Sequence, residues 1–366
     1  MNLRIPGPTP VPAEVAQAGA AEMINHRGPQ FAAMLGRITA GAQQVFQTKN
    51  SVLTLTASGT GAMEAAVVNH VAPGEQVLVI TIGVFGQRFV DIVRAYGAEP
   101  VELAFDFGSA ADPAQVDDAL RANPGIRTVL VTHNETSTGT TNVYLPQISE
   151  VVHRHDALMI VDAISSLSSI PVQTDAWDLD VVLSGSQKGW MTAPGLAFVS
   201  VSDRAWARQE TNPMPRFYFD LRRAKDALAR GETPWTPAVS LVFQLDKAIE
   251  MMLAEGLDAI YERHRRLARM TRDGIRALGL ELLASEGLES DTVTAVKIPD
   301  GVDGSQFTKV AREQFDTVFA GGQGPLRGKI FRFGHLGYVH EPDIRAGLVA
   351  VEKTLVSLGY AVANRA

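Results

Sequence analysis

Short apolar runs alternate with amphipathic stretches through the middle of the chain. From residue 51 onward, seven runs rich in β-branched residues have the length of buried strands: SVLTL, EQVLVIT, EPVELAF, RTVLVTH, ALMIVDA, DVVLSG and LAFVSVS. Segments with helical periodicity separate most of them, at residues 61–71, 85–96, 112–122 and 145–155. This alternation predicts an α/β fold whose mostly parallel sheet is covered by helices on both faces.

The pattern changes after about residue 238. Two long amphipathic helices are expected at residues 239–254 and 257–278, and the charges of the second are typical of a solvated helix face. The runs LELLA, TVTAVKIP and KIFRFG follow, with further helices predicted at residues 306–314 and 342–358. Because domains usually hold roughly 100–200 residues, a chain of 366 residues favours two domains, the second a small α+β unit beginning near residue 256.

Charge and composition narrow the classes of function. The net charge of -7 disfavours a general attraction to nucleic acid or to an anionic membrane. The absence of cysteine excludes disulfides, thiolate metal sites and a thiol nucleophile, and no metal site is predicted. The amino-terminal residues lack an apolar signal segment, and the most apolar central stretch, residues 157–174, is interrupted by Asp162 and Pro171. We therefore expect a cytoplasmic protein.

Two polar residues follow predicted strands at positions where chemistry is expected. An open α/β sheet binds ligands beyond the carboxyl ends of its strands. Lys188 follows the run DVVLSG, and Asp162 ends the run ALMIVDA. A carboxylate and an amine at neighbouring strand ends meet the needs of a pyridoxal phosphate site, where one pairs with the ring nitrogen and the other forms the Schiff base. The alternatives are a plain surface lysine and a helix N-cap at Asp162.

A turn of small residues precedes the helix predicted from residue 61. Free backbone N–H groups at a helix start bind phosphate, and Ser58, Gly59 and Thr60 are the candidates. An ordinary N-cap would give the same local pattern. A dinucleotide-binding fingerprint is disfavoured because Glu64 stands where its third glycine belongs.

Taken together, these segments resemble class V aminotransferases, in particular the alanine–glyoxylate and serine–pyruvate branch. The resemblance covers nearly the whole chain, and its motifs occur in the family's order: PGPTPVP, HRGPQF, TASGTGAMEA, GVFGQR, THNETSTG, VDAISS, SGSQKGW, TPWTPAVSL and FRFGHLGY. It implies a fold-type I, pyridoxal-phosphate-dependent homodimer. Each chain would have an N-terminal arm (residues 1–20), a large cofactor-binding domain (21–255) and a small C-terminal domain (256–366).

The resemblance also implies roles for individual residues. Lys188 would hold the cofactor, Asp162 would pair with its ring nitrogen, and Gln187 would join the turn of Ser58, Gly59 and Thr60 at the phosphate. Thr136 matches the family's cofactor-contacting serine. Phe85 stands where many relatives have a tryptophan stacked on the cofactor ring, so this chain lacks the indole N–H donor at that position. Thr233 and Thr236 would reach the phosphate in the other subunit, although the local alignment shifts by one residue and favours Thr236.

Substrate recognition is expected at Arg332, in FRFGHLGY, where the family binds the substrate carboxylate. The planar guanidinium matches a carboxylate with two parallel hydrogen bonds, whereas the alternative is a structural salt bridge. His26 and Arg27 lie in a segment that approaches the active site in relatives. We favour a structural or interface role for Arg27 over recognition of a second acidic group.

These residues predict transfer of an amino group from alanine or serine to glyoxylate or pyruvate by ping-pong kinetics. Aspartate, ureidoglycine or a phosphonate could replace the donor, since such relatives share most of the motifs. The absence of cysteine argues against a cysteine desulfurase, and the absence of metal-ligand clusters gives no support to the hydrogenase-subunit label that some relatives carry. The non-enzyme alternative is a nucleotide-binding α/β protein in which Lys188 is incidental.

Overall fold

The computed structural model of the protein describes residues 1–363. Its largest element is a seven-stranded sheet in the order β2-β10-β9-β8-β5-β3-β4, in which only β10 runs antiparallel to its neighbours. The seven apolar runs form these strands, which confirms the prediction of a mostly parallel sheet. In chain order they are β2 (Ser51–Thr56), β3 (Gln76–Thr81), β4 (Glu99–Ala104), β5 (Thr128–Thr132), β8 (Leu158–Asp162), β9 (Val181–Gly185) and β10 (Leu196–Val201).

Successive residues of the central strands face two different cores. Leu78 and Ile80 of β3 pack in one apolar cluster, whereas Val77 and Val79 pack in the other. This is the alternation expected when a sheet is covered on both faces. One face is covered by α2 (Pro29–Phe46), α5 (Pro113–Ala122), α6 (Leu145–Arg154) and α9 (Val239–Glu255); the other by α3 (Gly59–His70), α4 (Val84–Ala95), α7 (Asp203–Thr211) and α8 (Leu221–Leu228).

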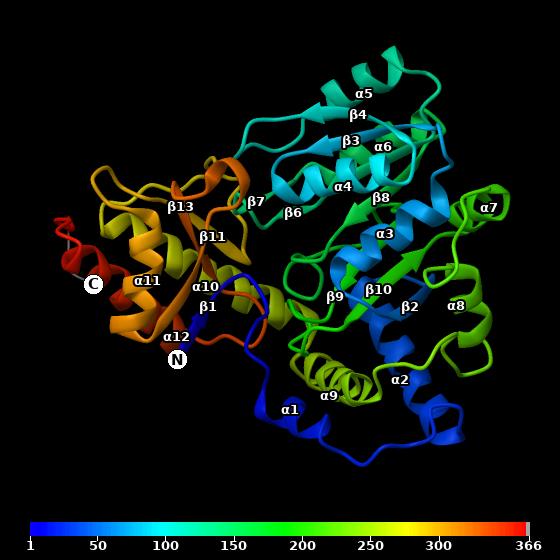
Figure 1. Cartoon of the computed structure of the whole chain (residues 1–366), viewed down its shortest axis with the longest axis horizontal. Helices are drawn as coiled ribbons and strands as arrows, with labels where there is room; N and C mark the ends of the chain where they lie inside the picture. Colours follow the sequence, from blue (N-terminus) through cyan, green and yellow to red (C-terminus); the bar gives the residue numbers. More distant parts are fainter. Residues whose placement is uncertain (364–366) are drawn as a thin grey trace.

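A second, four-stranded sheet has the order β1-β12-β13-β11 and lies beside the large one in Figure 1. Residues from the two ends of the chain build it together, since β1 pairs in parallel with β12. The run LELLA forms only an isolated bridge from Leu282 to Val296. The elements of this part are β1 (Asn2–Arg4), α10 (Leu257–Ala277), β11 (Val293–Lys297), α11 (Gly304–Phe315), β12 (Thr317–Gly321), a 3-10 turn η1 (Gly324–Leu326), β13 (Ile330–Gly334) and α12 (Glu341–Ser357).

The domain boundary near residue 256 stays a prediction. Gly256 lies between α9 and α10, and α10 runs from the large sheet toward the small one (Figure 1). The predicted N-terminal arm contains β1 and the short helix α1 (Ala13–Ala18), so it contributes a strand to the small sheet. The remaining short strands, β6 (Asn134–Glu135) and β7 (Thr140–Thr141), form a hairpin after β5.

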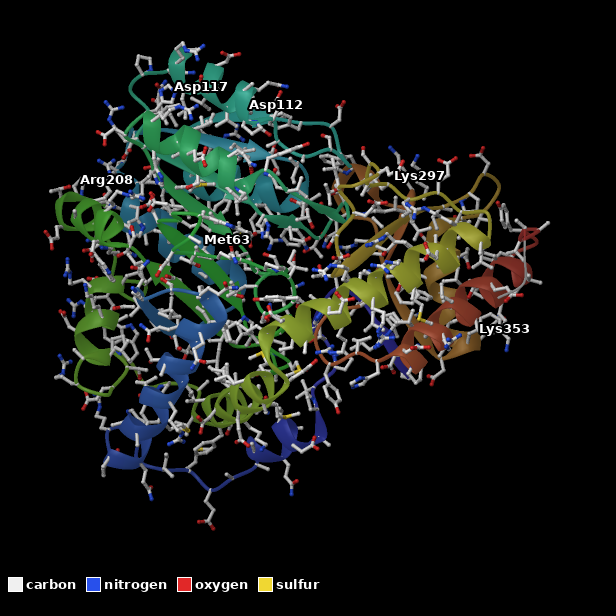
Figure 2. The ribbon with its side chains drawn as sticks, turned by 180° about the vertical axis from the view of Figure 1, so that it is seen from behind. Met63, Asp112, Asp117, Arg208, Lys297 and Lys353 are labelled. Atoms are coloured by element: carbon white, nitrogen blue, oxygen red, sulfur yellow. The ribbon has the colours of Figure 1, made fainter. Side chains whose placement is uncertain are left out.

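Charged side chains lie on the outside of both parts. In Figure 2, Arg208 and Lys353 project at the periphery, whereas Met63 of α3 lies inside and is fully buried. Among residues 1–363, every helix is either too short or too polar to cross a membrane.

Candidate active site

The sheet brings the two predicted catalytic residues to one edge. β8 ends at Asp162, which pairs with Leu183 of β9, and Lys188 follows the end of β9 by three residues. Both side chains line one cavity at this edge of the sheet. The cavity is lined by Ser58, Gly59, Thr60, Phe85, Arg88, Asn134, Thr136, Asp162, Ile164, Ser165, Gln187 and Lys188.

The N-terminal segment holds Lys188 from the other side. The Lys188 amine donates a 2.8 Å hydrogen bond to the carbonyl of Pro6, and the Thr9 hydroxyl donates one of 2.8 Å to the carbonyl of Lys188. Glycine suits position 7, because its φ of +149° is a conformation that other residues rarely adopt, and a Cβ atom there would lie 2.6 Å from the Lys188 Nζ atom. Lys188 is therefore a partly buried, oriented amine, and a plain surface lysine is excluded.

Burial and charge bring the two groups close to neutral pH. Burial, assisted by the charges of Arg332 and Arg88, lowers the pKa of Lys188 from 10.5 to about 8, although Asp162 opposes the shift. Burial likewise raises the pKa of Asp162 to about 7, with a contribution from Glu135. A carboxyl group and an amine with such pKa values in a cavity are typical of a catalytic site.

Asp162 also makes a local backbone contact. Its Oδ1 atom accepts a 2.8 Å hydrogen bond from the N–H of Ile164. The residues that follow form turns rather than a helix, so the alternative of a helix N-cap does not hold and the contact only fixes the carboxylate at the strand end.

The predicted phosphate turn has free donors. α3 begins at Gly59, and the side chain of Ser58 at its N-cap position makes no capping hydrogen bond, which disfavours the ordinary N-cap interpretation. Gly59 packs tightly, since a Cβ there would lie 2.7 Å from the Cδ1 atom of Ile164. The buried Oε1 atom of Gln187, another residue that lines the cavity, has no hydrogen-bond partner. The free helix N–H groups fit a cofactor with a phosphate group.

α4 presents an aromatic ring and a cation to the same cavity. Phe85 and Arg88 lie one turn apart, and the guanidinium carbon of Arg88 lies 4.6 Å from the centre of the Phe85 ring. Arg88 also donates a 2.9 Å hydrogen bond to the hydroxyl of Thr60. Phe85 was predicted from the sequence and Arg88 was not, although its spacing of three residues from Phe85 on a predicted helix could have indicated it.

Arg332 lies next to the cavity without lining it. The side chain is only 6% exposed, and burial lowers its pKa to about 10. It donates hydrogen bonds to the carbonyls of Gly321, at 3.1 Å, and of Thr136, at 3.4 Å. No carboxylate pairs with it at ion-pair distance among residues 1–363, so the salt-bridge alternative is not what the structure shows.

Four residues considered from the resemblance lie elsewhere in the chain. Thr233 and Thr236 line a different pocket, beside Trp235. Arg27 forms an ion pair of 2.8 Å with Glu232 at the surface, and His26 precedes it in the same turn. Within one chain, none of them lines the cavity of Lys188.

Other residues of the site escaped sequence reasoning. Asn134 donates to the hydroxyls of Ser165 and Thr292, at 2.8 and 2.9 Å, and so ties the cavity wall to the small sheet. The Pro6 carbonyl contacts Lys188 from more than 180 residues away in sequence. Both belong to quoted motifs, but their partners could be known only from the folded chain.

Comparison with known proteins agrees with this geometry. Residues 4–323 match the family Aminotransferase class-V. The soluble hydrogenase small subunit of Synechococcus sp. (strain PCC 6716) is 45% identical over 98% of this chain and 94% of its own length. The L-aspartate–glyoxylate aminotransferase of Paracoccus denitrificans is 36% identical over 98% and 92%. The solved alanine–glyoxylate aminotransferase of Nostoc sp. superposes with a TM-score of 0.94 at 29% identity, over 97% of this chain and 95% of that one.

The chain therefore belongs to the class V aminotransferases. It is a pyridoxal-phosphate-dependent transaminase with the fold-type I architecture, as predicted. The family membership removes the nucleotide-binding alternative. The free donors at the start of α3 and the Lys188–Asp162 pair fit the cofactor that the family uses.

Proposed function

We propose that the protein transfers the amino group of alanine or serine to glyoxylate, or to pyruvate, with Lys188 as the cofactor lysine. The observation that carries the proposal is the cavity in which Lys188 and Asp162 face the phosphate turn, next to the buried Arg332. A cytoplasmic location stays a prediction from the sequence.

The chain's own groups divide the chemistry between them. Bound pyridoxal phosphate supplies an electrophilic carbonyl carbon and a ring that accepts electrons. Lys188 moves the substrate's α-proton at its Nζ atom; with a pKa of about 8, roughly a tenth of free amines would be neutral at pH 7. Asp162 keeps the proton on the ring nitrogen. Arg332 binds the substrate carboxylate, which orients the α-carbon toward Lys188.

A small neutral donor fits the charges available. Arg332 offers one clamp for one carboxylate, and Arg27 is engaged with Glu232 at the surface. The second carboxylate of aspartate would require another cation to offset its desolvation. We expect kcat/KM with glyoxylate to be at least about 10-fold higher for alanine or serine than for aspartate, as measured by steady-state kinetics.

The competing candidate is aspartate as donor. It is favoured by the presence of a second cation, Arg88, in the cavity, and by the aspartate-specific name of the Paracoccus relative. The kinetics should be repeated in Arg88→Ala and in Arg27→Ala, with Arg37→Ala as the matched control for Arg27, because Arg37 forms a comparable surface ion pair with Asp246. A wild-type preference for aspartate that Arg88→Ala or Arg27→Ala removes would reject the neutral donor and leave the transaminase intact.

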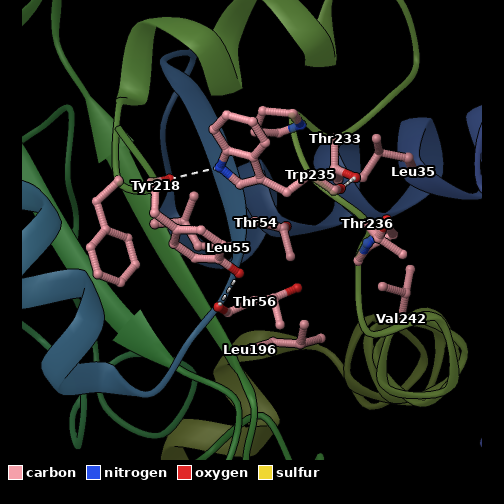
Figure 3. Close-up of a pocket in the computed structure, with 13 residues that line it drawn as sticks. Leu35, Thr54, Leu55, Thr56, Leu196, Tyr218, Thr233, Trp235, Thr236 and Val242 are labelled. Atoms are coloured by element: carbon pink, nitrogen blue, oxygen red, sulfur yellow. Dashed lines mark hydrogen bonds between the residues drawn. The ribbon is translucent and has the colours of Figure 1, made fainter. Parts of the chain in front are cut away.

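We also infer that the active form is a homodimer with shared sites. Tyr218 is 47% exposed and stacks with Trp235 beside the pocket that Thr236 lines (Figure 3). Phe217, which is 65% exposed, also stacks with Trp235. An exposed aromatic patch of this kind is typical of an interface. The Thr233 hydroxyl donates to the carbonyl of Trp235, whereas Thr236 is exposed, which supports Thr236 as the residue that reaches the partner's phosphate.

Thr236→Ala should weaken cofactor retention about 10-fold, the effect of losing one hydrogen bond to a charged group. Equilibrium dialysis of pyridoxal phosphate measures it, and Thr233→Ala is the control. Mixed dimers of Lys188→Ala and Thr236→Ala subunits should contain one site free of both changes and recover tight binding there. A fully active monomer in sedimentation would refute the shared site.

A further inference from the structure

Glu135 is a buried carboxylate that the proposed mechanism does not use. It lies in β6, is fully buried, and precedes Thr136 of the cavity wall. Burying a carboxylate is costly unless its oxygens are hydrogen-bonded. Glu135 lies between the cofactor cavity and the substrate-binding arginine, and its hydrogen-bond partners indicate which segments it holds in place.

Every hydrogen bond to the Glu135 carboxylate is donated into it. The backbone N–H of Phe85 lies 3.1 Å from Oε2 and 3.3 Å from Oε1, and that of Gly86 lies 3.1 Å from Oε2. Ser137 donates its N–H at 3.1 Å and its hydroxyl at 2.6 Å to Oε1. The Ser137 oxygen in turn accepts from the N–H of Val84 at 3.0 Å.

These contacts favour the ionised carboxylate. Burial raises the pKa of Glu135, but the donors from Ser137, Gly86 and Phe85 oppose that shift. A proton on Oε2 would face only the N–H groups of Phe85 and Gly86, which cannot accept a hydrogen bond. The positive end of the α4 dipole stabilises an anion at the same place.

The carboxylate replaces the missing cap of α4. Gly83 stands at the N-cap position and has no side chain, so Glu135 and Ser137 bind the first N–H groups of the helix instead. A Cβ at Gly83 would lie 2.4 Å from Cγ of Glu135, which leaves room for no other residue there. The first turn of α4 is therefore fixed to the segment that follows β5.

We propose that Glu135 is a positioning residue that sets the orientation of Phe85 and Arg88 toward the cofactor. Phe85 extends from the turn that Glu135 holds and Arg88 from the next turn of α4, and both line the cavity. Glu135 also precedes Thr136, whose carbonyl oxygen accepts a hydrogen bond from Arg332. One buried carboxylate therefore connects the part of α4 that faces the cofactor site to the residue that contacts the proposed substrate-binding arginine. This inference rests on the proposed cofactor site at Lys188.

The test is Glu135→Gln, which keeps the size of the side chain but turns an amide N–H₂ group toward backbone donors. We expect affinity for pyridoxal phosphate to fall about 10-fold, since hydrogen bonds to a charged group are lost. The circular dichroism of the bound cofactor's visible band should shrink as the ring of Phe85 moves. Equilibrium dialysis and visible circular dichroism give the two readouts.

Asp180→Asn is the matched control. Asp180 is also fully buried and multiply hydrogen-bonded, but it precedes β9, at the opposite end from Lys188. It should lower the melting temperature and leave cofactor affinity within about twofold. The milder Ser137→Ala provides a folded variant should Glu135→Gln not fold, and it should weaken cofactor binding about threefold, the effect of one net hydrogen bond.

Unchanged cofactor affinity in both Glu135→Gln and Ser137→Ala, or an equal loss in Asp180→Asn, would overturn the inference. Failure of the proposed cofactor site would give a different result: the wild-type protein would then bind the cofactor through a lysine other than Lys188.

Discussion

Replacing Lys188 with alanine should abolish the covalent cofactor adduct and lower kcat by at least about 10²–10⁴-fold, the effect of losing the general base alone. The amine is held by the Pro6 carbonyl against the cavity that Asp162 lines, so no other group occupies its place. Borohydride reduction followed by peptide mass analysis measures the adduct. An adduct on any other lysine in wild-type protein would disprove the assignment.

Lys188→Ala should still fold, and the pH dependence of the free energy of unfolding provides a control. Because burial lowers the pKa of Lys188 from 10.5 to about 8, the unfolded chain binds that proton more tightly than the folded one. Cofactor-free wild type should therefore gain stability between pH 8 and 10.5, and Lys188→Ala should lack this gain. Denaturant titrations at pH 7 and 10 compare the free energies of unfolding. Lys247→Ala, at an exposed lysine paired with Glu250, should follow the wild type.

Asp162→Asn should reduce turnover by about 10²–10³-fold, equivalent to about 3–4 kcal/mol of barrier. The neutral amide accepts the same hydrogen bond from Ile164 but cannot hold a proton on the ring nitrogen. Single-turnover rates with the cofactor-loaded variant measure the loss, because they exclude differences in cofactor content.

Asp180→Asn should instead lower the stability of the fold more than it lowers turnover. The Asp180 carboxylate pairs with Arg204 and His153, so Asp180→Asn should cost about 3 kcal/mol of unfolding free energy. Its turnover per cofactor-loaded molecule should remain near that of wild type. Equal turnover in Asp162→Asn and wild type would contradict the role of Asp162.

Local sequence was sufficient for the large sheet. Its strands read as continuous apolar runs because both faces are buried, and the intervening helices have the 3.6-residue period of a single apolar stripe. Elements outside this alternation were missed, including α2, α7, α8, β1 and β12. β1 has three residues and is a strand only because β12 pairs with it, a contact between segments more than 300 residues apart.

Within the site, too, local sequence indicated some residues, whereas other features depend on contacts made only in the folded chain. Strand ends pointed to Lys188 and Asp162 because the carboxyl ends of parallel strands meet at one edge of a sheet. The motifs pointed to Arg332 and to the phosphate turn through resemblance. Sequence alone could not show that Arg332 hydrogen-bonds to Thr136, nor that Thr236 lies away from the cavity of its own chain.

The sequence by itself determined the class of fold, the cofactor and the types of residue proposed for catalysis and binding, because each depends on local periodicity or on a contiguous motif. The tertiary structure decided how those residues are held. The Pro6 carbonyl at Lys188 and the Glu135 carboxylate at the start of α4 both join segments distant along the chain. Their geometry follows from packing, strand register and the hydrogen-bonding needs of buried polar groups, which no local pattern encodes.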